Sequence, residues 1–358
     1  MRKFFLLLAL LLPVIQAFCQ QNAKDILLKN YRPVSIYKTP KANITKAAWP
    51  VIDLHSHDYA DSEKDIDEWV KTMDKLGIKK IMILTYTTGK GFDSAVEKYS
   101  KYPDRFELWC GFDYTGHGKA GWQKHAVEEL ERCYKKGAKG VGELGDKGEG
   151  ELYSQPTPGI GLHIDDPQMK PLLQKCGELK MPISIHVAED AWMYLPPDSS
   201  NDGLMNAATW HVNMNKPGKY GHDELIRSLE NAIRDNPKTT FIACHLANTC
   251  SDLSVLGAML DKYPNLYADI AARYAEISPV PRYTAAFITR YQDRLVYGTD
   301  MGMDENMYKT TFRILESADE HFYEQDQFGY HWSLYGLDLS KDVLEKLYHL
   351  NAEKILNQ

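Results

Sequence analysis

Short apolar runs alternate with amphipathic helical patterns along the chain from residue 51 onward. Eight runs have the length and residue content of buried strands, at residues 51–57, 79–86, 106–113, 138–145, 182–188, 239–247, 265–272 and 294–300. Between them, apolar positions recur every three or four residues in segments such as 65–77, 126–137, 169–180 and 223–237. Apolar strands that are each followed by a helix predict a parallel sheet with helices on both faces.

Eight such units are the number in a (β/α)8 TIM barrel, which we predict for a single domain over residues 49–358. A doubly wound open sheet is the alternative. We disfavour it because polar residues gather at the carboxyl ends of strands from both halves of the chain, and an open sheet would leave those ends far apart. The two longest connections, residues 146–166 and 189–222, follow the fourth and fifth strands, and loops of this length are commonly functional.

The N-terminus has the charge order and length of a secretory signal peptide, which we predict for residues 1–19. Arg2 and Lys3 precede an apolar run that ends at Phe18 and Cys19, and a lead-in over residues 20–48 follows. Lipoprotein anchoring at Cys19 is disfavoured because Phe18 is bulky where a small residue is required. We therefore expect a secreted or periplasmic protein without stable membrane insertion after cleavage.

Charge and cysteine content narrow the class of protein. The formal charge of −7 becomes −9 once the two positive charges of the signal peptide are removed, and no basic stripe is present, which argues against a nucleic-acid partner. Besides Cys19 the chain has an odd number of cysteines and no CxxC pair, namely Cys110, Cys133, Cys176, Cys244 and Cys250. Buried thiols are favoured over disulfides, despite the predicted export.

Ligand-type residues stand at the ends of five predicted strands. They are His55 and His57 of the first, Glu143 of the fourth, His186 of the fifth, His245 of the sixth and Asp300 of the eighth. Any one of these histidines alone would more often be an ordinary polar residue, but strand ends converge in a barrel and buried polar groups need partners. The set predicts one or two divalent metal ions, with Zn²⁺ favoured and Mn²⁺ or Fe²⁺ compatible. Cys244 precedes His245, so strand alternation predicts that its thiol points outward.

Three motifs resemble the amidohydrolase superfamily and, within it, the amidohydrolase-related (amidohydrolase 2) family: IDLHSH at 52–57, YGTD at 297–300 and NAEKIL at 351–356. The strand-four motif GEL at 142–144 looks more like the TatD-type nucleases of the superfamily, which leaves one metal or two open. The resemblance implies that His55, His57, His186, His245 and Asp300 are metal ligands and that Glu143 bridges if a second ion is present. Lys139 is a weaker candidate for the carbamylated lysine of some members.

The implied activity is hydrolysis of an amide, ester or lactone by metal-activated water. Asp300 would take the proton of that water and pass it to the leaving group, and His245, or a metal-free His186, would polarise the carbonyl. The alternative within the family is a nonoxidative decarboxylase. A third hypothesis is a barrel that binds metal or solute without catalysis, against which the intact Asp300 argues.

The substrate is expected to be a small molecule that carries an anionic group. Arg273 continues the seventh strand and would bind that group, with a salt bridge to Asp269 or Glu276 as the alternative role. Loop 189–222 is expected to cover the site and set specificity, because it carries Trp192, Met193, Tyr194, Trp210 and His211. Of these, Trp192, Tyr194 and His211 are expected to contact the substrate. The alternative is that these side chains seal the outside of the barrel or form a subunit contact, and a homo-oligomer is compatible with the sequence.

Overall fold

The computed structural model describes residues 23–214 and 219–357 of the chain. The predicted signal peptide lies outside these residues. The described lead-in begins with two short 3-10 helices, Ala23–Asp25 and Leu28–Asn30, and then runs without regular structure to the first strand. It is attached to the rest of the molecule by hydrogen bonds such as Ala42 N to Asp319 Oδ1 at 2.8 Å.

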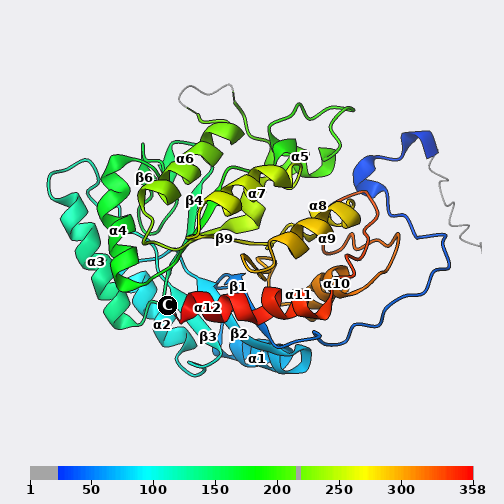
Figure 1. The fold of residues 1–358 in the computed structure, drawn as a ribbon, viewed down its shortest axis with the longest axis horizontal. Coiled ribbons are helices and arrows are strands. Elements are labelled where there is room, and N and C mark those ends of the chain that lie inside the picture. The colour runs from blue at the N-terminus through cyan, green and yellow to red at the C-terminus, as the bar shows by residue number, and fades with distance from the viewer. Residues whose placement is uncertain (1–22, 215–218, 358) are drawn as a thin grey trace, which may run out of the picture.

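Eight parallel strands form the centre of the molecule (Figure 1). They are β1 (Val51–Ser56), β2 (Ile78–Leu84), β3 (Phe106–Trp109), β4 (Val141–Asp146), β7 (Ile183–Val187), β8 (Phe241–Ala243), β9 (Leu266–Asp269) and β10 (Leu295–Val296). Regular pairing gives the orders β1-β2-β3 and β10-β9-β8-β7-β4. Each predicted strand is present, although β3, β8, β9 and β10 are much shorter than the apolar runs that contain them.

Backbone hydrogen bonds join these two sets of strands into a closed ring. On one side, Cys110 after β3 pairs in parallel with Val141 of β4. On the other, the Leu54 amide of β1 donates to the Tyr297 carbonyl at 3.0 Å, and the Thr299 amide donates to the His55 carbonyl at 3.1 Å. The fold is therefore a (β/α)8 barrel, as predicted, and the open-sheet alternative is wrong.

Helices surround the barrel and follow its strands in order (Figure 1). They are α1 (Glu63–Leu76), α2 (Gly89–Tyr99), α3 (Trp122–Lys136), α4 (Lys170–Leu179), α5 (Leu204–Trp210), α6 (His222–Asp235), α7 (Leu253–Lys262), α8 (Tyr274–Ile277), α9 (Pro281–Arg290), α10 (Glu305–Glu316), α11 (Lys341–Glu345) and α12 (Asn351–Leu356). Local sequence fixes their ends. In α1, the Ser62 hydroxyl accepts from the Asp65 amide, and Gly77 ends the helix in the left-handed conformation at φ 84°.

Two apolar layers hold the barrel together. The larger one lies between strands and helices. A smaller cluster joins Leu54 of β1, Met82 of β2 and Ile242 of β8 with Ile355 of α12. Because it connects strands from different parts of the ring, this cluster fills the enclosed interior below the carboxyl ends, so the site above it has a rigid floor.

The connection after β4 contains a short antiparallel hairpin that the sequence pattern does not predict, formed by β5 (Glu151–Leu152) and β6 (Gly159–Ile160). None of the helices in the described residues combines the length and apolar character needed to cross a bilayer. The five cysteines in the described part of the chain are all buried free thiols, as expected.

Candidate metal centre

The six predicted ligand residues come together at the carboxyl ends of the strands. His55 lies in β1 and His57 directly follows it, Glu143 lies in β4, His186 in β7, and His245 and Asp300 follow β8 and β10. Their ligand atoms form three overlapping groups in which all atoms lie within 4.8 Å of one another: His55 with His57 and Glu143, His55 with His245 and Asp300, and Glu143 with His186 and His245.

Glu143 lies at the centre of this cluster. Its Oε1 is 3.2 Å from His186 Nδ1 and 3.2 Å from His245 Nε2. The same oxygen is 3.6 Å from His55 Nε2, and Oε2 is 3.4 Å from His57 Nε2. An ion that holds nitrogen and oxygen ligands at about 2.0–2.2 Å in tetrahedral geometry separates them by about 3.3–3.6 Å. The observed spacing fits that value.

Asp300 faces the same space from the opposite side of the cluster. Its Oδ1 lies 3.0 Å from His57 Nε2 and 3.8 Å from His55 Nε2, and Oδ2 lies 3.7 Å from His245 Nε2. The Tyr59 hydroxyl donates to Oδ1 at 3.2 Å. Asp300 can therefore hold an ion while one oxygen keeps a hydrogen bond to the protein.

The outer nitrogens of three histidines are fixed by acceptors. His57 Nδ1 donates to the Leu84 carbonyl at 2.8 Å, and His245 Nδ1 donates to the Ala271 carbonyl at 2.9 Å. His55 Nδ1 lies 2.9 Å from Asp269 Oδ2. Second partners of this kind orient histidine ligands in metal sites and select the tautomer.

This tautomer creates a demand for positive charge at the centre of the cluster. In the neutral tautomer with Nδ1 protonated, the Nε2 atoms of His57 and His245 present lone pairs to carboxylate oxygens, so positive charge is needed between them. Although burial acts to lower it, the contacts with Asp300 and Glu143 accordingly raise the pKa of His57 to about 9. The buried Nε2 of His55 has no hydrogen-bond partner among the described residues. A metal ion between these atoms would satisfy all of them, and the residues present therefore fit a divalent ion.

His186 is reversed relative to the other three histidines. Its Nδ1 faces Glu143, and its Nε2 lies 3.6 Å from Glu189 Oε2. Lys147 Nζ pairs with the other oxygen of Glu189 at 2.6 Å. A carboxylate of the loop after β7 therefore lies beside His186, which the sequence reading did not identify, although His186 Nε2 makes no hydrogen bond among the described residues.

Electrostatics keep both carboxylates of the centre ionised. Burial acts to raise the pKa of Asp300, but the His55 charge and the hydrogen bond with His57 outweigh it and lower that pKa. Burial also acts to raise the pKa of Glu143, and the neighbouring imidazoles, His55 first, bring it well below its usual range. Burial and the His186 charge lower the pKa of His245, which favours the neutral, metal-binding imidazole.

A left-handed backbone turn carries His245 into the site. Residues 245 to 248 all have positive φ, and His245 itself has φ 60°. The prediction for Cys244 is wrong. Strand alternation gives the inward position to Cys244, whose thiol lies 3.0 Å from Ser184 Oγ and close to His55 and Asp269. His245 reaches the metal centre because the turn, and not the alternation of β8, sets its direction.

Asp269 supports the centre from below, and sequence reasoning missed this role. At the end of β9, it pairs with His55 and also accepts from the amides of His245 and Ala271 at 2.7 and 3.0 Å. Gly298 makes room for the His55 side chain, since a Cβ at residue 298 would lie 2.7 Å from the His55 Cβ. A carboxylate at the end of the seventh strand was the signal that could have identified Asp269.

Lys139 is exposed and precedes β4, so the structure does not support its role as a carbamylated ligand. Its position before the strand, rather than at the carboxyl end, keeps it away from the cluster.

Arg273 is 8% exposed, and protein groups already engage its guanidinium. Nε donates to Asn248 Oδ1 at 3.0 Å, and Nη1 donates to the Ala272 carbonyl at 3.0 Å and lies 3.5 Å from Glu276 Oε1. The structure thus shows the alternative salt bridge, with Glu276 rather than Asp269. Arg273 also lines the cavity described next, so its contact with an anionic substrate group stays a prediction.

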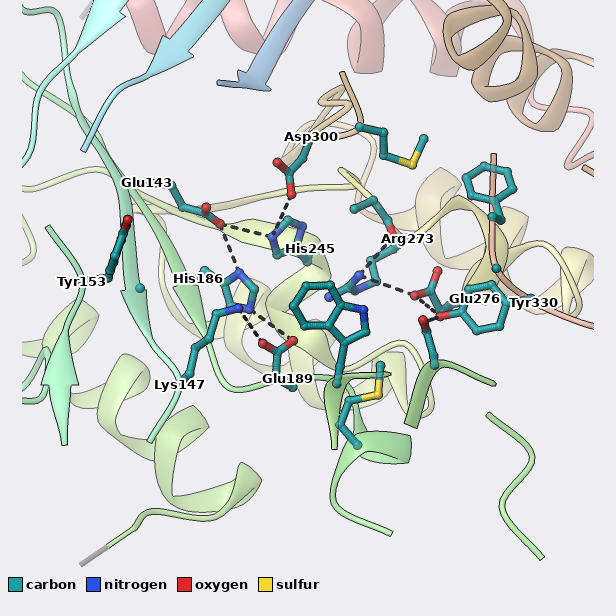
Figure 2. A pocket seen from close by; sticks show the side chains of 18 of the residues that line it. Glu143, Lys147, Tyr153, His186, Glu189, His245, Arg273, Glu276, Asp300 and Tyr330 are labelled. Carbon is teal, nitrogen blue, oxygen red and sulfur yellow. Dashed lines mark hydrogen bonds and ion pairs between the residues drawn. The ribbon is translucent and has the colours of Figure 1, made fainter. Parts of the chain in front are cut away.

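A cavity of about 690 Å³ opens beside the metal centre (Figure 2). His186, His245, Glu143 and Asp300 lie at its inner end, and Arg273 and Glu276 lie along one side. The loop after β7 forms one wall through Met193, Asn206 and Trp210, and the segment between α10 and α11 forms another through residues 327–330. The sequence reading missed the second wall, for which the aromatic run FGYHW at 328–332 was the available signal.

The three side chains predicted to contact substrate from loop 189–222 do not line this cavity in the described part of the chain: Trp192, Tyr194 and His211. The Trp192 ring lies 6.0 Å from that of Trp332, and the Tyr194 hydroxyl accepts from the Glu189 amide at 3.2 Å. His211 is exposed. These residues shape the loop, while its neighbouring side chains Met193 and Trp210 face the cavity.

Comparison with solved structures shows the same fold. An amidohydrolase from Staphylococcus aureus matches with a TM-score of 0.55 at 16% identity, over 86% of this chain and 99% of that one. A 5-carboxyvanillate decarboxylase from Novosphingobium aromaticivorans, complexed with manganese, matches with a TM-score of 0.51 at 14% identity over 88% and 99%. A 4-oxalomesaconate hydratase from Rhodopseudomonas palustris matches with a TM-score of 0.51 at 14% identity over 86% and 95%.

No protein with curated function matches the chain in sequence. A sequence model of the family described as amidohydrolase, in contrast, matches residues 52–358, which include all of the barrel except the first residue of β1 and every residue of the candidate metal centre. The chain therefore belongs to the amidohydrolase family of metal-dependent enzymes.

Proposed function

We propose that this protein is an exported hydrolase that uses one or two divalent ions, with Zn²⁺ favoured, to cleave an amide, ester or lactone. The observation that carries the proposal is the convergence of four histidines and two ionised carboxylates at the inner end of an open cavity. Export rests on the signal-peptide pattern of residues 1–19.

His55, His57, Glu143, His186, His245 and Asp300 would hold the ion or ions. When bound, a divalent ion lowers the pKa of a coordinated water towards ~7 and polarises a carbonyl oxygen. Glu143 lies 3.2–3.6 Å from nitrogens of all four histidines, and it would contribute to holding both ions if two are bound.

Asp300 is the residue we assign to proton transfer. Its two oxygens face the histidines, it lines the cavity, and the Tyr59 hydroxyl holds Oδ1. It would take a proton from the attacking water and pass it to the leaving oxygen or nitrogen. His245, at the same inner end of the cavity, would stabilise negative charge that develops on the carbonyl oxygen.

The test is a substrate panel with the zinc-loaded and manganese-loaded protein. The panel contains esters, lactones, N-acyl compounds and hydroxybenzoates, and the matched variants are Asp300→Asn and Asp304→Asn. Asp304 is exposed and caps α10, a role that asparagine also fills. We expect hydrolysis of at least one ester, lactone or amide, a fall in kcat of about 10²- to 10⁴-fold in Asp300→Asn, and no change in Asp304→Asn.

Release of CO₂ from a hydroxybenzoate with no hydrolysis would instead establish the decarboxylase alternative. A near-native rate in Asp300→Asn would show that Asp300 is not the proton-transfer residue. Full metal content without turnover of any compound would favour the binding-protein hypothesis.

A further inference from the structure

A second cavity, of about 530 Å³, adjoins the same metal centre. Glu143 and Tyr153 line both this cavity and the larger one, and His57 lines the second. Its walls come from the loop after β1, the end of β2, helix α2 and residue Gln155. The metal centre therefore lies where two cavities meet, and a substrate bound there has space on both sides of the reacting bond.

Aromatic rings line the second cavity beside the metal centre. Tyr86 follows β2 in a left-handed conformation with φ 45°, which is unfavourable for a residue with a Cβ and is held by its surroundings. Its amide donates to the Gly142 carbonyl at 2.9 Å, and its carbonyl accepts from the Gln155 amide at 2.9 Å. The Tyr86 ring thus lies 5.8 Å from the His57 ring and 5.0 Å from the Tyr153 ring.

The second cavity is rich in hydroxyl groups and has little unpaired charge. Its lysine and its aspartate pair with each other, since Lys98 Nζ lies 2.7 Å from Asp58 Oδ1. Apart from the metal-centre residues His57 and Glu143, the remaining polar lining consists of hydroxyls and one amide: Tyr59, Thr85, Tyr86, Thr87, Ser94, Tyr153 and Gln155.

The larger cavity carries more charged side chains, although Lys147 pairs with Glu189 and Arg273 pairs with Glu276. Besides the metal-centre residues, it is lined by charged side chains, namely Lys147, Glu149, Glu151, Glu189, Arg273 and Glu276. A hydroxyl can accept a second hydrogen bond while it donates one, so the second cavity suits a neutral group with several hydroxyls. The two cavities therefore select different chemical groups.

We propose that the second cavity binds a neutral, polyhydroxylated part of the substrate, with Tyr86 and Tyr153 as the aromatic surface against which its carbon skeleton packs. This inference rests on the proposed hydrolysis and deepens it. Water would add its hydroxyl to the carbonyl carbon and its proton to the leaving oxygen or nitrogen, so both halves of the substrate need space. A decarboxylase releases only CO₂ and has no need of a cavity this large on that side.

The experiment uses two metal-binding probes with the same six-carbon chain. Gluconohydroxamic acid carries five hydroxyls, and hexanohydroxamic acid carries none. Their dissociation constants are measured by isothermal titration calorimetry with the zinc-loaded full chain, together with the zinc content of each protein. Binding of these probes requires no turnover, so the outcome is separable from the activity tests.

Two variants alter the cavity and one serves as control. Ser94→Trp fills the cavity from an exposed position of α2, and Thr87→Val removes a lining hydroxyl with little change of shape. Glu97→Trp places the same large side chain on α2 at an exposed position outside the lining.

We expect the dissociation constant of gluconohydroxamate to be at least tenfold higher for Ser94→Trp than for the wild type. For Thr87→Val we expect it to be about threefold higher or more. Hexanohydroxamate should change less than twofold in either variant because the larger cavity remains open, and Glu97→Trp should match the wild type for both probes. Equal binding of gluconohydroxamate to all four proteins, or equal weakening of both probes in Ser94→Trp, would overturn the subsite.

If neither probe binds a fully zinc-loaded wild type, both proposals are wrong: the metal centre is not open to ligands, and the subsite does not exist. The expected probe pattern without hydrolysis of any panel compound would leave the subsite standing and overturn the hydrolase proposal.

Discussion

At the scale of single residues, a buried group of three charges stands out beside the larger cavity. Arg273 lies between two carboxylates, with Nη1 3.5 Å from Glu276 Oε1 and Nε 4.0 Å from Asp190 Oδ2. Burial raises the pKa of Glu276 to about 7, although the Arg273 charge acts to lower it. Burial raises the pKa of Asp190 in the same way. One guanidinium does not compensate two buried carboxylates, so this group disfavours full ionisation.

The pKa of Glu276 gives stability a defined pH dependence. The folded state binds this proton more tightly than the unfolded chain, so the stabilisation is fully present below about pH 4.5 and is lost as the pH rises through about 7. The shift is worth of the order of 3 kcal/mol. Glu276→Gln should therefore lose less unfolding free energy than the wild type between pH 5 and pH 8, as measured by urea denaturation of the metal-free proteins.

Glu230→Gln is the control, because the hydrogen bond with Lys262 lowers the pKa of Glu230 and its contribution changes only below that window. Curves for Glu276→Gln and wild type that run parallel from pH 5 to pH 8 would contradict the assignment.

Sequence and structure agree on ligand-type residues and differ on the residues that orient them. A strand end is visible as the last polar position of an apolar run, which is why the sequence predicted Glu143, His186 and Asp300. The turn that directs His245 is set by backbone geometry over residues 245 to 248, and alternation cannot reveal it. The sequence did not predict the supporting role of Asp269, because its partners, His55 and the His245 amide, are distant in sequence.

At the scale of elements, two connections form walls of the larger cavity, and the sequence predicted a functional role for only one of them. The loop after β7 was predicted from its length and aromatic content, and it contains helix α5. The segment between α10 and α11 has no strand or long helix and was not singled out. The two connections touch where the Trp192 ring lies 6.0 Å from that of Trp332 and where the Asn206 amide contacts the Tyr330 hydroxyl.

Shortening the loop after β7 tests its role in specificity. Replacement of residues 195–209 with a short Gly/Ser linker removes Asn206 and most of α5 but leaves the barrel strands and the metal-centre residues untouched. We expect the fold, by circular dichroism, and the zinc content to persist while the relative kcat/KM values over the substrate panel change. The small apolar cluster of Met193, Ala207 and Val212 would be lost, which we expect to lower stability by about 1–3 kcal/mol.

A Gly/Ser replacement of residues 116–120 is the matched control, since this stretch connects β3 to α3 and lines neither cavity. Unchanged selectivity in the 195–209 variant, or a change confined to its oligomeric state, would show that the loop has the subunit-contact role instead.

At the scale of the whole molecule, the barrel was predictable because its strands are continuous apolar runs separated by helical patterns. The closure of the ring depends on pairings between distant segments, such as Leu54 with Tyr297, and no local signal encodes them. The count of eight units and the polar strand ends made closure the better hypothesis. The second cavity was not predictable, because it depends on the left-handed Tyr86 and on how α2 packs against the loop after β1.

The metal centre also links strands across the ring, so its ion should stabilise the whole molecule. Its ligands come from β1, β4 and β7 and from the turns after β8 and β10, and without an ion their acceptor atoms face one another. Free ion at 100 times its dissociation constant adds about 2.7 kcal/mol to the unfolding free energy. For a domain of this size, that corresponds to a rise in Tm of roughly 4 °C. Chelation should lower Tm by that amount, and elemental analysis should show loss of metal from His55→Ala and His186→Ala.

His125→Ala, at an exposed histidine paired with Asp113 outside the centre, should keep both its metal and its Tm response. Full metal content in both His55→Ala and His186→Ala would place the ion elsewhere in the protein.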